Sequence, residues 1–277
     1  MVSIIHVSNG AITTNKHINR RYGKIDKVGE NVLLYQGDCL EEMDKIQDKS
    51  IDMILCDLPY GTTACKWDTV IPFEPLWAQY KRVIKGNGAI VLTASQPFTS
   101  ALVMSNLRQF KYELIWNKGN GKAPGVAKYR PMPSHESVLL FGSGTTTYNP
   151  QFTDGKPYKD VRKKPRLNGN GNEHGFGYQN VPETINDGYR YPLSVLNITS
   201  FNQRGNHPTQ KPVALLEYLI RTYTNEGETV LDNCMGSGST GVACTNTNRR
   251  FIGIELDENY YNISKKRIEE ALHIVCE

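Results

Sequence analysis

The strongest constraint on the fold is a largely apolar run, Ile51 to Cys56, that ends at Asp57-Leu58-Pro59-Tyr60-Gly61. A short run of this kind, followed by a proline and a glycine, is typical of a strand buried inside a parallel sheet. In open α/β sheets, ligands bind just beyond the carboxyl ends of the strands. We therefore expect Asp57 and the residues that follow it to form part of a binding site.

Strand-like and helix-like segments alternate along most of the chain. Further strands are predicted at residues 32–35, 89–93, 112–116, 137–141, 229–232 and 251–255. Helices are predicted over 72–84 and 98–110, from Cys39, from Pro212, and over the last residues, where apolar side chains recur at helical spacing. This alternation indicates an α/β fold with a doubly wound, mostly parallel sheet.

Two regions lack the alternation. Residues 1–30 are polar and basic, and we expect an arm whose charges are either solvated or in contact with phosphates. Residues 143–204 are rich in Gly, Asn, Pro and Tyr without a clear period, and we expect a small irregular insertion. The main domain is then formed by two halves, residues 31–142 and 205–277.

Length and composition exclude some classes of protein. The 277 residues suit one domain with a small insertion, and no apolar run is long enough to span a bilayer. We expect a cytoplasmic protein without a membrane partner. None of the six cysteines forms a C-x-x-C pair, so no metal site is expected.

A glycine-rich loop follows the strand at 229–232. Gly236, Gly238 and Gly241 fit the dinucleotide fingerprint, which makes an NAD-dependent oxidoreductase one alternative. However, Asp232 ends the strand, and three residues separate it from the first of these glycines. A carboxylate there suits a ligand with an ammonium group better than a pyrophosphate. Glu255 ends the next strand, where an acid can bind ribose hydroxyls. S-adenosylmethionine combines these groups, although Asp232 as a local cap and Glu255 as a surface acid remain the alternatives.

The tetrapeptide Asp57-Leu58-Pro59-Tyr60 suits transfer of a group to an exocyclic base amine. Such an amine is a poor nucleophile, and two hydrogen-bond acceptors would stabilise the positive charge that develops on it. Asp57 can provide a carboxylate oxygen and Leu58 its backbone carbonyl, because Pro59 favours an extended Leu58 and has no N–H. Tyr60 can stack on the base. An ordinary Asp-Pro turn is the alternative.

Basic side chains gather in the loops and in the insertion. The candidates for contacts with nucleic acid are Lys66, Lys118, Lys122, Lys128, Arg130, Lys156, Tyr158, Lys159, Arg162, Lys163, Lys164 and Arg166. Cations neutralise phosphates and neighbouring aromatic rings stack on bases. A solvated basic loop is the alternative.

These motifs resemble those of the DNA amino-methyltransferases. Asp57-Leu58-Pro59-Tyr60 is similar to their D-P-P-Y motif in its adenine-type version, and Asp232 to Thr240 is similar to their cofactor loop. His207 to Pro212 resembles the segment that precedes this loop. The order of catalytic motif, irregular insertion and cofactor loop resembles the permuted group called β. The resemblance extends from about Asn31 to the C-terminus.

The resemblance implies a permuted Rossmann-like methyltransferase fold in which the insertion recognises double-stranded DNA. It implies that Asp38, a plausible helix N-cap, lies near the cofactor adenine together with Cys39, and that Thr209 and Lys211 lie near the cofactor carboxylate. The remaining residues that it assigns to S-adenosylmethionine are Asp232, Met235, Gly236, Gly238, Ser239, Thr240 and Glu255. Members of this family are often homodimers.

The predicted function is methylation of the N6 amine of a flipped adenine in DNA. Cytosine-type relatives usually have Ser in place of Asp57, which favours adenine over the N4 amine of cytosine. Leu58 departs from the usual proline, with little expected effect because only its carbonyl is used. An inactive DNA-binding protein and an enzyme acting on RNA are the further alternatives.

Overall fold

The computed structural model describes residues 6–8, 11–13, 23–61, 69–121, 124–160, 184–199 and 210–276 of the chain. They belong to two compact units, one formed by Met1–Asn149 with Ser194–Glu277 and the other by Pro150–Leu193. None of the described helices is long and apolar enough to cross a membrane.

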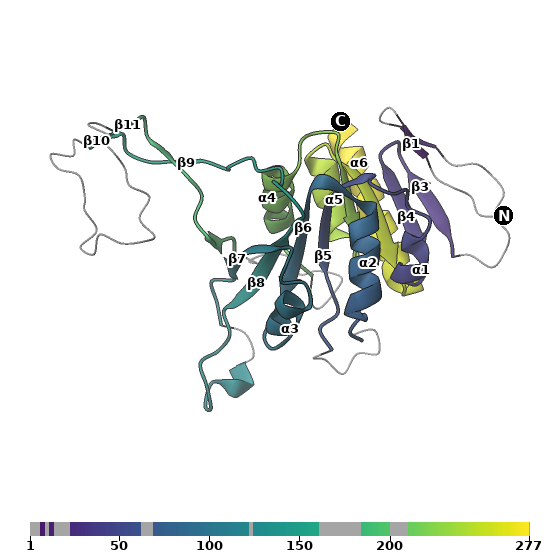
Figure 1. The fold of residues 1–277 in the computed structure, drawn as a ribbon, viewed down its shortest axis with the longest axis horizontal. Coiled ribbons are helices and arrows are strands. Elements are labelled where there is room, and N and C mark those ends of the chain that lie inside the picture. Colours follow the sequence, from purple (N-terminus) through teal and green to yellow (C-terminus); the bar gives the residue numbers. More distant parts are fainter. Residues whose placement is uncertain are drawn as a thin grey trace. The chain divides into compact units, whose positions relative to one another are not determined.

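A nine-stranded sheet forms the centre of the larger unit (Figure 1). Its strands, in spatial order, are β13 (Val195–Asn197), β7 (Phe110–Asn117), β8 (His135–Phe141), β6 (Ile84–Ala94), β5 (Ile51–Asp57), β14 (Thr229–Asp232), β15 (Arg250–Glu255), β4 (Val32–Gln36) and β3 (Ile25–Val28). β8 is antiparallel to both of its neighbours and β3 is antiparallel to β4, whereas the other neighbouring strands run parallel. The predicted α/β fold with a mostly parallel sheet is confirmed.

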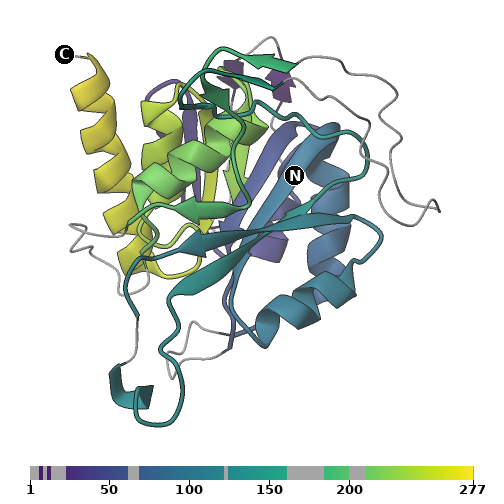
Figure 2. The same ribbon diagram turned by 90° about the vertical axis from the view of Figure 1, so that its left-hand side faces the viewer.

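Helices cover both faces of the sheet (Figures 1 and 2). They are α1 (Cys39–Met43), α2 (Phe73–Val83), α3 (Phe98–Ser105), α4 (Val213–Tyr223), α5 (Ser239–Asn246) and α6 (Glu258–Cys276), with a short 3-10 helix, η1, at Pro124–Val126. Side chains of α1, α2 and α3 pack in one core and those of α4, α5 and α6 in the other. Neighbouring strand residues alternate between them, as Leu33 and Leu34 do.

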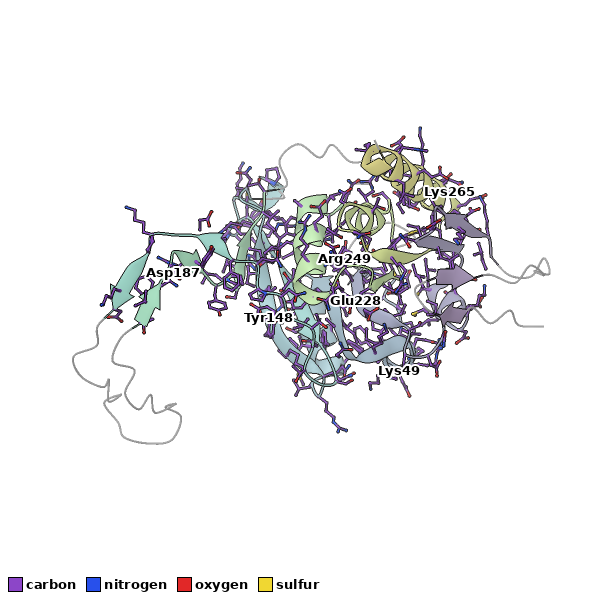
Figure 3. The ribbon with its side chains drawn as sticks, turned by 90° about the horizontal axis from the view of Figure 1, so that it is seen from above. Lys49, Tyr148, Asp187, Glu228, Arg249 and Lys265 are labelled. Atoms are coloured by element: carbon purple, nitrogen blue, oxygen red, sulfur yellow. The ribbon has the colours of Figure 1, made fainter. Side chains whose placement is uncertain are left out.

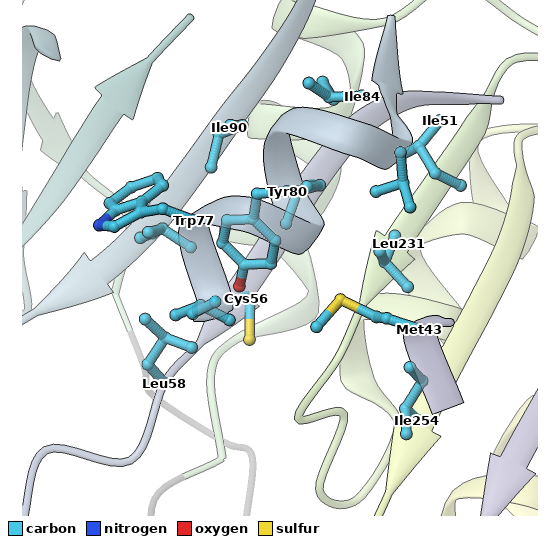
Figure 4. Packing of buried hydrophobic residues seen from close by; sticks show 14 of the residues in the cluster. Met43, Ile51, Cys56, Leu58, Trp77, Tyr80, Ile84, Ile90, Leu231 and Ile254 are labelled. Carbon is cyan, nitrogen blue, oxygen red and sulfur yellow. The ribbon is translucent and has the colours of Figure 1, made fainter. Parts of the chain in front are cut away.

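The first core anchors the elements that carry the predicted catalytic motif. Figure 4 shows Tyr80 of α2 beside Cys56 of β5, with Leu58, which follows β5, on one side of Cys56 and Met43 of α1 on the other. Each of these four side chains is at most 4 % exposed. Burying a large apolar side chain contributes roughly 1.5–3 kcal/mol. This packing therefore fixes the backbone on both sides of Asp57.

The order of the strands places two chain segments side by side that are far apart in sequence. β5 pairs in parallel with β14, with Ile54 opposite Leu231. From β5 the chain continues to β6 on one side, and from β14 it continues to β15 on the other. Such a point of divergence opens a crevice at the carboxyl ends of the strands. Asp57 and Asp232 are the last residues of these two strands.

Several elements differ from the sequence prediction. Residues 25–28, expected within an arm, form the edge strand β3. β6 begins at Ile84 rather than 89, because its chain pairs with β5 across an irregularity between Ile51 and Met53. α3 ends at Ser105 instead of 110. Preceding β3, the backbone of β1 (His6–Ser8) pairs antiparallel with β2 (Ala11–Thr13).

The smaller unit, Pro150–Leu193, spans fewer residues than the insertion predicted over 143–204. β13 pairs in parallel with β7, which makes its residues part of the large sheet. Within the smaller unit, β9 (Thr153–Asp154) pairs with β12 (Tyr189–Arg190), and β10 (Tyr158–Asp160) pairs with β11 (Thr184–Asn186). Asp187, labelled in Figure 3, lies in the tight turn between β11 and β12, where Gly188 has a φ of 106°.

Candidate active site

A cavity of about 400 Å³ lies at the carboxyl ends of β4, β5, β14 and β15. Its volume is in the range of small-molecule sites, roughly 300–1,000 Å³. Four carboxylates that the sequence singles out, Asp38, Asp57, Asp232 and Glu255, line this one cavity. The structure therefore brings the predicted catalytic motif and most of the predicted cofactor residues together.

Asp57 is held by three donors. Its Oδ1 accepts a hydrogen bond of 2.6 Å from the Tyr60 hydroxyl and another from the Thr93 hydroxyl. Its Oδ2 lies 2.5 Å from Nζ of Lys211. An ionised carboxylate has about four acceptor positions, so one position, on Oδ2, is left for a further donor. The side chain is 30 % exposed, which leaves it accessible from the cavity.

The rest of the tetrapeptide fixes the turn after β5. Leu58 is 4 % exposed and packs in the first core. Because Pro59 follows it, the backbone of Leu58 is restricted, which fixes the direction of its carbonyl. The Tyr60 ring stacks on Phe98 with the ring centres 5.1 Å apart and an angle of 28°. Burial, followed by the charge of Asp57, raises the pKa of Tyr60 well above its usual value. Tyr60 is therefore a neutral hydroxyl donor.

Lys211 lies between two carboxylates. Besides Asp57, its Nζ lies 3.3 Å from Oε2 of Glu136, the second residue of β8. Burial acts to lower the pKa of Lys211, but the negative charges of Asp57 and Glu136 outweigh it, so the pKa is raised above its ordinary value. Lys118 forms an ion pair with Oε1 of Glu136. The resemblance implied a position for Lys211 near the cofactor carboxylate, and the structure adds this direct contact with Asp57.

Asp232 has a different environment. It is 3 % exposed, its Oδ2 accepts a hydrogen bond of 2.6 Å from the Thr240 hydroxyl, and its Oδ1 accepts one of 3.1 Å from the Cys234 N–H. No described residue forms an ion pair with it. Burial raises its pKa to about 7. A cationic group of a ligand would therefore stabilise this carboxylate.

The glycine loop needs its glycines for conformation and close packing. Gly236 has a φ of 51° and Gly238 a φ of 77°, both in the left-handed region. A Cβ on Gly238 would lie 2.7 Å from Cβ of Ser264 in α6. Gly238 does not itself line the cavity but precedes Ser239, which begins α5 and does. Arg267 of α6 supports the loop with hydrogen bonds to the carbonyl and, at 2.9 Å, the hydroxyl of Ser237.

Two further acids combine a local role with a place at the cavity. Oε2 of Glu255 accepts a 2.8 Å hydrogen bond from the Gly236 N–H and Oε1 a 2.9 Å bond from the Asp257 N–H. Burial raises the pKa of Glu255, and its remaining acceptor positions are available to ribose hydroxyls. Asp38 caps α1 through the Leu40 N–H, at 2.8 Å, as the cap alternative predicts. Its presence at the cavity also agrees with a place near the cofactor.

Three free cysteines, Cys39, Cys56 and Cys234, also line the cavity. A hydrogen bond from Cys234 lowers the pKa of Cys39, whereas burial raises that of Cys56 to about 12. The neighbouring Asn233 accepts a buried hydrogen bond of 2.6 Å from the Tyr80 hydroxyl. This polar floor contributes to the shape of the cavity beneath the glycine loop.

Apart from Gly238 and Lys118, which are described above, the predicted residues fall into three groups. Leu58, Pro59, Tyr60, Cys39, Lys211, Met235, Gly236, Ser239 and Thr240 line the cavity with the four carboxylates. Lys128 and Arg130 are exposed after η1, and Lys156, Tyr158 and Lys159 are exposed in the smaller unit. Lys66, Lys122, Arg162, Lys163, Lys164, Arg166 and Thr209 lie outside the described residues.

Sequence reasoning missed Glu136 and Thr93. Glu136 stands in an otherwise unremarked His-Glu-Ser context, and Thr93 was interpreted only as part of a strand. Because β6 pairs with β5 and with β8, Thr93 contacts Asp57, and Glu136 contacts Lys211, the ion-pair partner of Asp57. Only knowledge of this pairing would have identified them.

The residues present fit S-adenosylmethionine. Asp232 offers a buried carboxylate without an ion-pair partner in the described chain for the ammonium, and Glu255 offers acceptors for the ribose. Ile71, Leu40 and Val70 give the cavity apolar walls. The crevice of this open α/β sheet contains an acidic strand end, a glycine loop and the hydrogen-bond acceptors of Asp57 and Leu58. These features together are typical of the class of S-adenosylmethionine-dependent methyltransferases.

Comparison with known proteins identifies the family. The family model described as "DNA methylase" (N6_N4_Mtase) matches residues 51–266, so the chain belongs to this family. The chain is 28 % identical over 266 residues to the "DNA adenine methyltransferase YhdJ" of Escherichia coli (strain K12), covering 88 % of this chain and 85 % of that protein. It is 28 % identical over 271 residues to "Type II methyltransferase M2.LlaDCHI" of Lactococcus lactis subsp. cremoris, covering 87 % and 91 %.

Solved structures agree with this assignment. The M1.HpyAVI complex with S-adenosylmethionine superposes with a TM-score of 0.58 at 26 % identity, covering 86 % of this chain and 98 % of that chain. The PvuII cytosine-N4-specific methyltransferase superposes with a TM-score of 0.59 at 17 % identity, covering 88 % and 91 %, and supports the fold alone. The protein is an S-adenosylmethionine-dependent DNA methyltransferase.

Proposed function

We propose that this protein methylates the exocyclic N6 amine of adenine in DNA. The observation that carries the proposal is the pair of strand ends in one cavity, with Asp57 offering one acceptor position and Asp232 lacking an ion-pair partner among described residues. Relatives named as adenine methyltransferases support the choice of base.

The amine needs acceptors because its lone pair is delocalised into the ring. Asp57 accepts one N–H through Oδ2, and the Leu58 carbonyl accepts the other, so both groups stabilise the positive charge that develops on nitrogen. When bound, S-adenosylmethionine supplies the electrophilic methyl group. The Tyr60 hydroxyl and Thr93 hold the Asp57 carboxylate in one orientation, which reduces the reorganisation needed during transfer.

Asp57 need not be a strong base in this scheme. The methylated amine is itself acidic, and a carboxylate already hydrogen-bonded to it can accept the proton or pass it to water. Tyr60 keeps its own proton, because burial and the charge of Asp57 raise its pKa. The chain therefore contributes orientation and a fixed negative charge.

Double-stranded DNA is the proposed substrate, with the target adenine flipped out of the helix. A base inside a duplex cannot reach a cavity of this kind. Lys128 and Arg130 offer exposed cations for phosphates. We also propose that the enzyme works in the cytoplasm and as a homodimer, as the family resemblance suggests.

The smaller unit is the proposed target-recognition domain. Its Phe152 ring lies 4.8 Å from that of Tyr191, and both are exposed. The Arg190 guanidinium lies 5.0 Å from the centre of the Tyr158 ring. Exposed rings beside cations suit stacking on bases and contact with phosphates. A variant with Tyr191→Ala should weaken DNA binding without altering cofactor binding.

Nucleoside analysis tests the proposed function. Purified protein is incubated with DNA from a strain that lacks adenine and cytosine methylation and with methyl-labelled S-adenosylmethionine, and the DNA is digested to nucleosides. We expect label in N6-methyl-2′-deoxyadenosine. Label in N4-methyl-2′-deoxycytidine would mean that the same mechanism acts on cytosine. A parallel incubation with RNA that gives label, when DNA gives none, would contradict DNA as the substrate.

A further inference from the structure

The ion pair between Asp57 and Lys211 conflicts with the chemistry proposed for Asp57. The ammonium of Lys211 lies 2.5 Å from Oδ2, the oxygen that retains an acceptor position. A cation there opposes the positive charge that develops on a neighbouring amine, since like charges repel most strongly in a buried site. If methyl transfer occurs at Asp57, this cation must be moved or balanced.

Glu136 provides the balance. Its Oε2 is buried, and its partner among the described residues is Nζ of Lys211, 3.3 Å away in an ion pair that does not have hydrogen-bond geometry. Because a buried oxygen that lacks a hydrogen bond is unfavourable, a closer approach of the ammonium would stabilise Oε2. Its Oε1 is held by Lys118, so the carboxylate has a fixed position at the start of β8.

The backbone of Lys211 is well placed for a small movement of its side chain. Oε1 of the preceding Gln210 accepts a hydrogen bond of 3.2 Å from the Ser237 hydroxyl, and Pro212 forms the N-cap of α4. These contacts hold both neighbours, so a movement of the ammonium would have to come from the stem of the Lys211 side chain, which is 8 % exposed. The negative charges of Asp57 and Glu136 outweigh burial and raise the pKa of Lys211, which favours the cationic form while both carboxylates are near.

We propose that Glu136 is a positioning residue that draws the Lys211 ammonium away from Asp57 when the target amine binds. This inference rests on the proposed function. In the exchange, Lys211 gives up its hydrogen bond to Oδ2 of Asp57 and donates to Oε2 of Glu136, while the amine N–H donates to Asp57. No covalent bond changes. Asp57, Glu136, Lys118 and Lys211 are together neutral before the amine arrives, and the exchange keeps the cation paired.

The exchange predicts which substitutions interact. Glu136→Gln should lower the single-turnover rate constant at saturating DNA and cofactor by about tenfold, with dissociation constants for both changed less than about threefold. Glu136→Asp, which keeps the charge, should recover most of the rate. In a Lys211→Met background, Glu136→Gln should have no further effect, because no cation remains to be moved. Glu113→Gln, in an exposed carboxylate of β7, is the matched control.

Two results would overturn this role. The first is an active wild type whose rate is unchanged by Glu136→Gln. The second is multiplication of the Glu136→Gln and Lys211→Met effects, which indicates independent structural roles. Thermal unfolding is recorded for each variant. If Glu136→Gln is unfolded at the assay temperature, the position of the Lys211 ammonium in the Asp57→Asn crystal structure decides the role of Glu136.

A crystal structure of Asp57→Asn tests the exchange without using activity. Removing the charge of Asp57 should leave Glu136 as the stronger partner, with Nζ of Lys211 at hydrogen-bond distance, about 3 Å, from Oε2. An ammonium that stays at residue 57 or turns to solvent would contradict the proposal. Inactive wild-type protein with the expected crystal structure would instead count against the proposed function alone.

Discussion

Asp57 and Asp232 occupy equivalent positions in very different surroundings. Each is the last residue of one of two neighbouring parallel strands, and both line the same cavity. Asp57 is 30 % exposed and paired with the ammonium of Lys211. Asp232 is 3 % exposed, and its donors among the described residues, which include the Thr240 hydroxyl and the Cys234 N–H, are neutral.

The contrast separates two ways of using a carboxylate. The protein provides the cation for Asp57, which holds that carboxylate in one orientation before a substrate arrives. For Asp232 the chain provides burial without a cation, which leaves the compensating charge to a ligand. Asp57 is therefore suited to the reacting amine, and Asp232 to the ammonium of the cofactor.

The largest effect is expected from Asp57→Ala. Losing the acceptor should lower the methyl-transfer rate by about a hundredfold or more, because transition-state charge on the amine is no longer stabilised. Cofactor and DNA binding, measured by calorimetry and by fluorescence anisotropy, should be retained. Asp48→Ala is the control, since Asp48 is 69 % exposed and forms an ion pair with Arg82. Normal turnover in Asp57→Ala would disprove the catalytic role.

Asp232→Asn should act on binding instead of the transfer step. A hydrogen bond to a charged group is worth about 1.5–3 kcal/mol, so cofactor affinity should fall by about tenfold or more. At pH 8 the variant should be at least as stable to thermal unfolding as the wild type, because an uncompensated buried charge is removed. Calorimetric titration with S-adenosylmethionine measures the first effect and a melting curve the second. Unchanged affinity would remove Asp232 from the cofactor site.

Cofactor affinity should also depend on pH through Asp232. Its pKa of about 7 in the folded chain lies above the ordinary 3.8, so the folded state holds a proton that the unfolded state has released between these values. The stability due to this proton is present at low pH and is lost as pH rises through about 7. An ammonium ligand prefers the ionised form, so affinity should rise by up to about tenfold per pH unit toward pH 7 and then level off.

The pH dependence is measured by calorimetric titration between pH 5.5 and 8, about 1.5 units below and one unit above the Asp232 pKa. The Asp232→Asn variant is the reference, and its affinity should vary little over this range. A wild type with equally flat affinity would show that the ligand does not compensate the charge of Asp232.

The smallest effect is expected from Leu58→Pro. Only the backbone carbonyl of Leu58 is assigned a role, so the rate should change by less than about threefold. Leu58 is buried in the first core, and exchange for a smaller ring should lower the melting temperature. Rate measurements at a temperature where both proteins are folded separate the two effects. A large loss of rate would assign the side chain itself to the site.

Local signals sufficed for much of the site. Each of three signals lies within a few residues: the apolar run before Asp57, the glycines after Asp232 and the acid at Glu255. The structure places Asp57, Gly236 and Glu255 at one cavity. The two strands themselves were predicted within one residue of their ends, because buried parallel strands have uniformly apolar sequences.

Long-range pairing decided the rest. Nothing near Glu136 indicates that β8 will lie next to β6 and bring this acid to Lys211. Likewise β3 was interpreted as part of an arm because its four residues have no pattern of their own until they pair with β4. Ion pairs between distant segments depend on the fold and are not written in either segment alone.

Nucleoside analysis of three proteins at saturating S-adenosylmethionine is the most direct test of how the two aspartates differ. Wild type, Asp57→Ala and Asp232→Asn are each incubated with unmethylated DNA and the methyl-labelled cofactor. We expect N6-methyl-2′-deoxyadenosine from the wild type, its recovery in Asp232→Asn once the cofactor is saturating, and almost none from Asp57→Ala. Methylated cytosine in place of adenine, or equal impairment of both variants at saturation, would contradict these assignments.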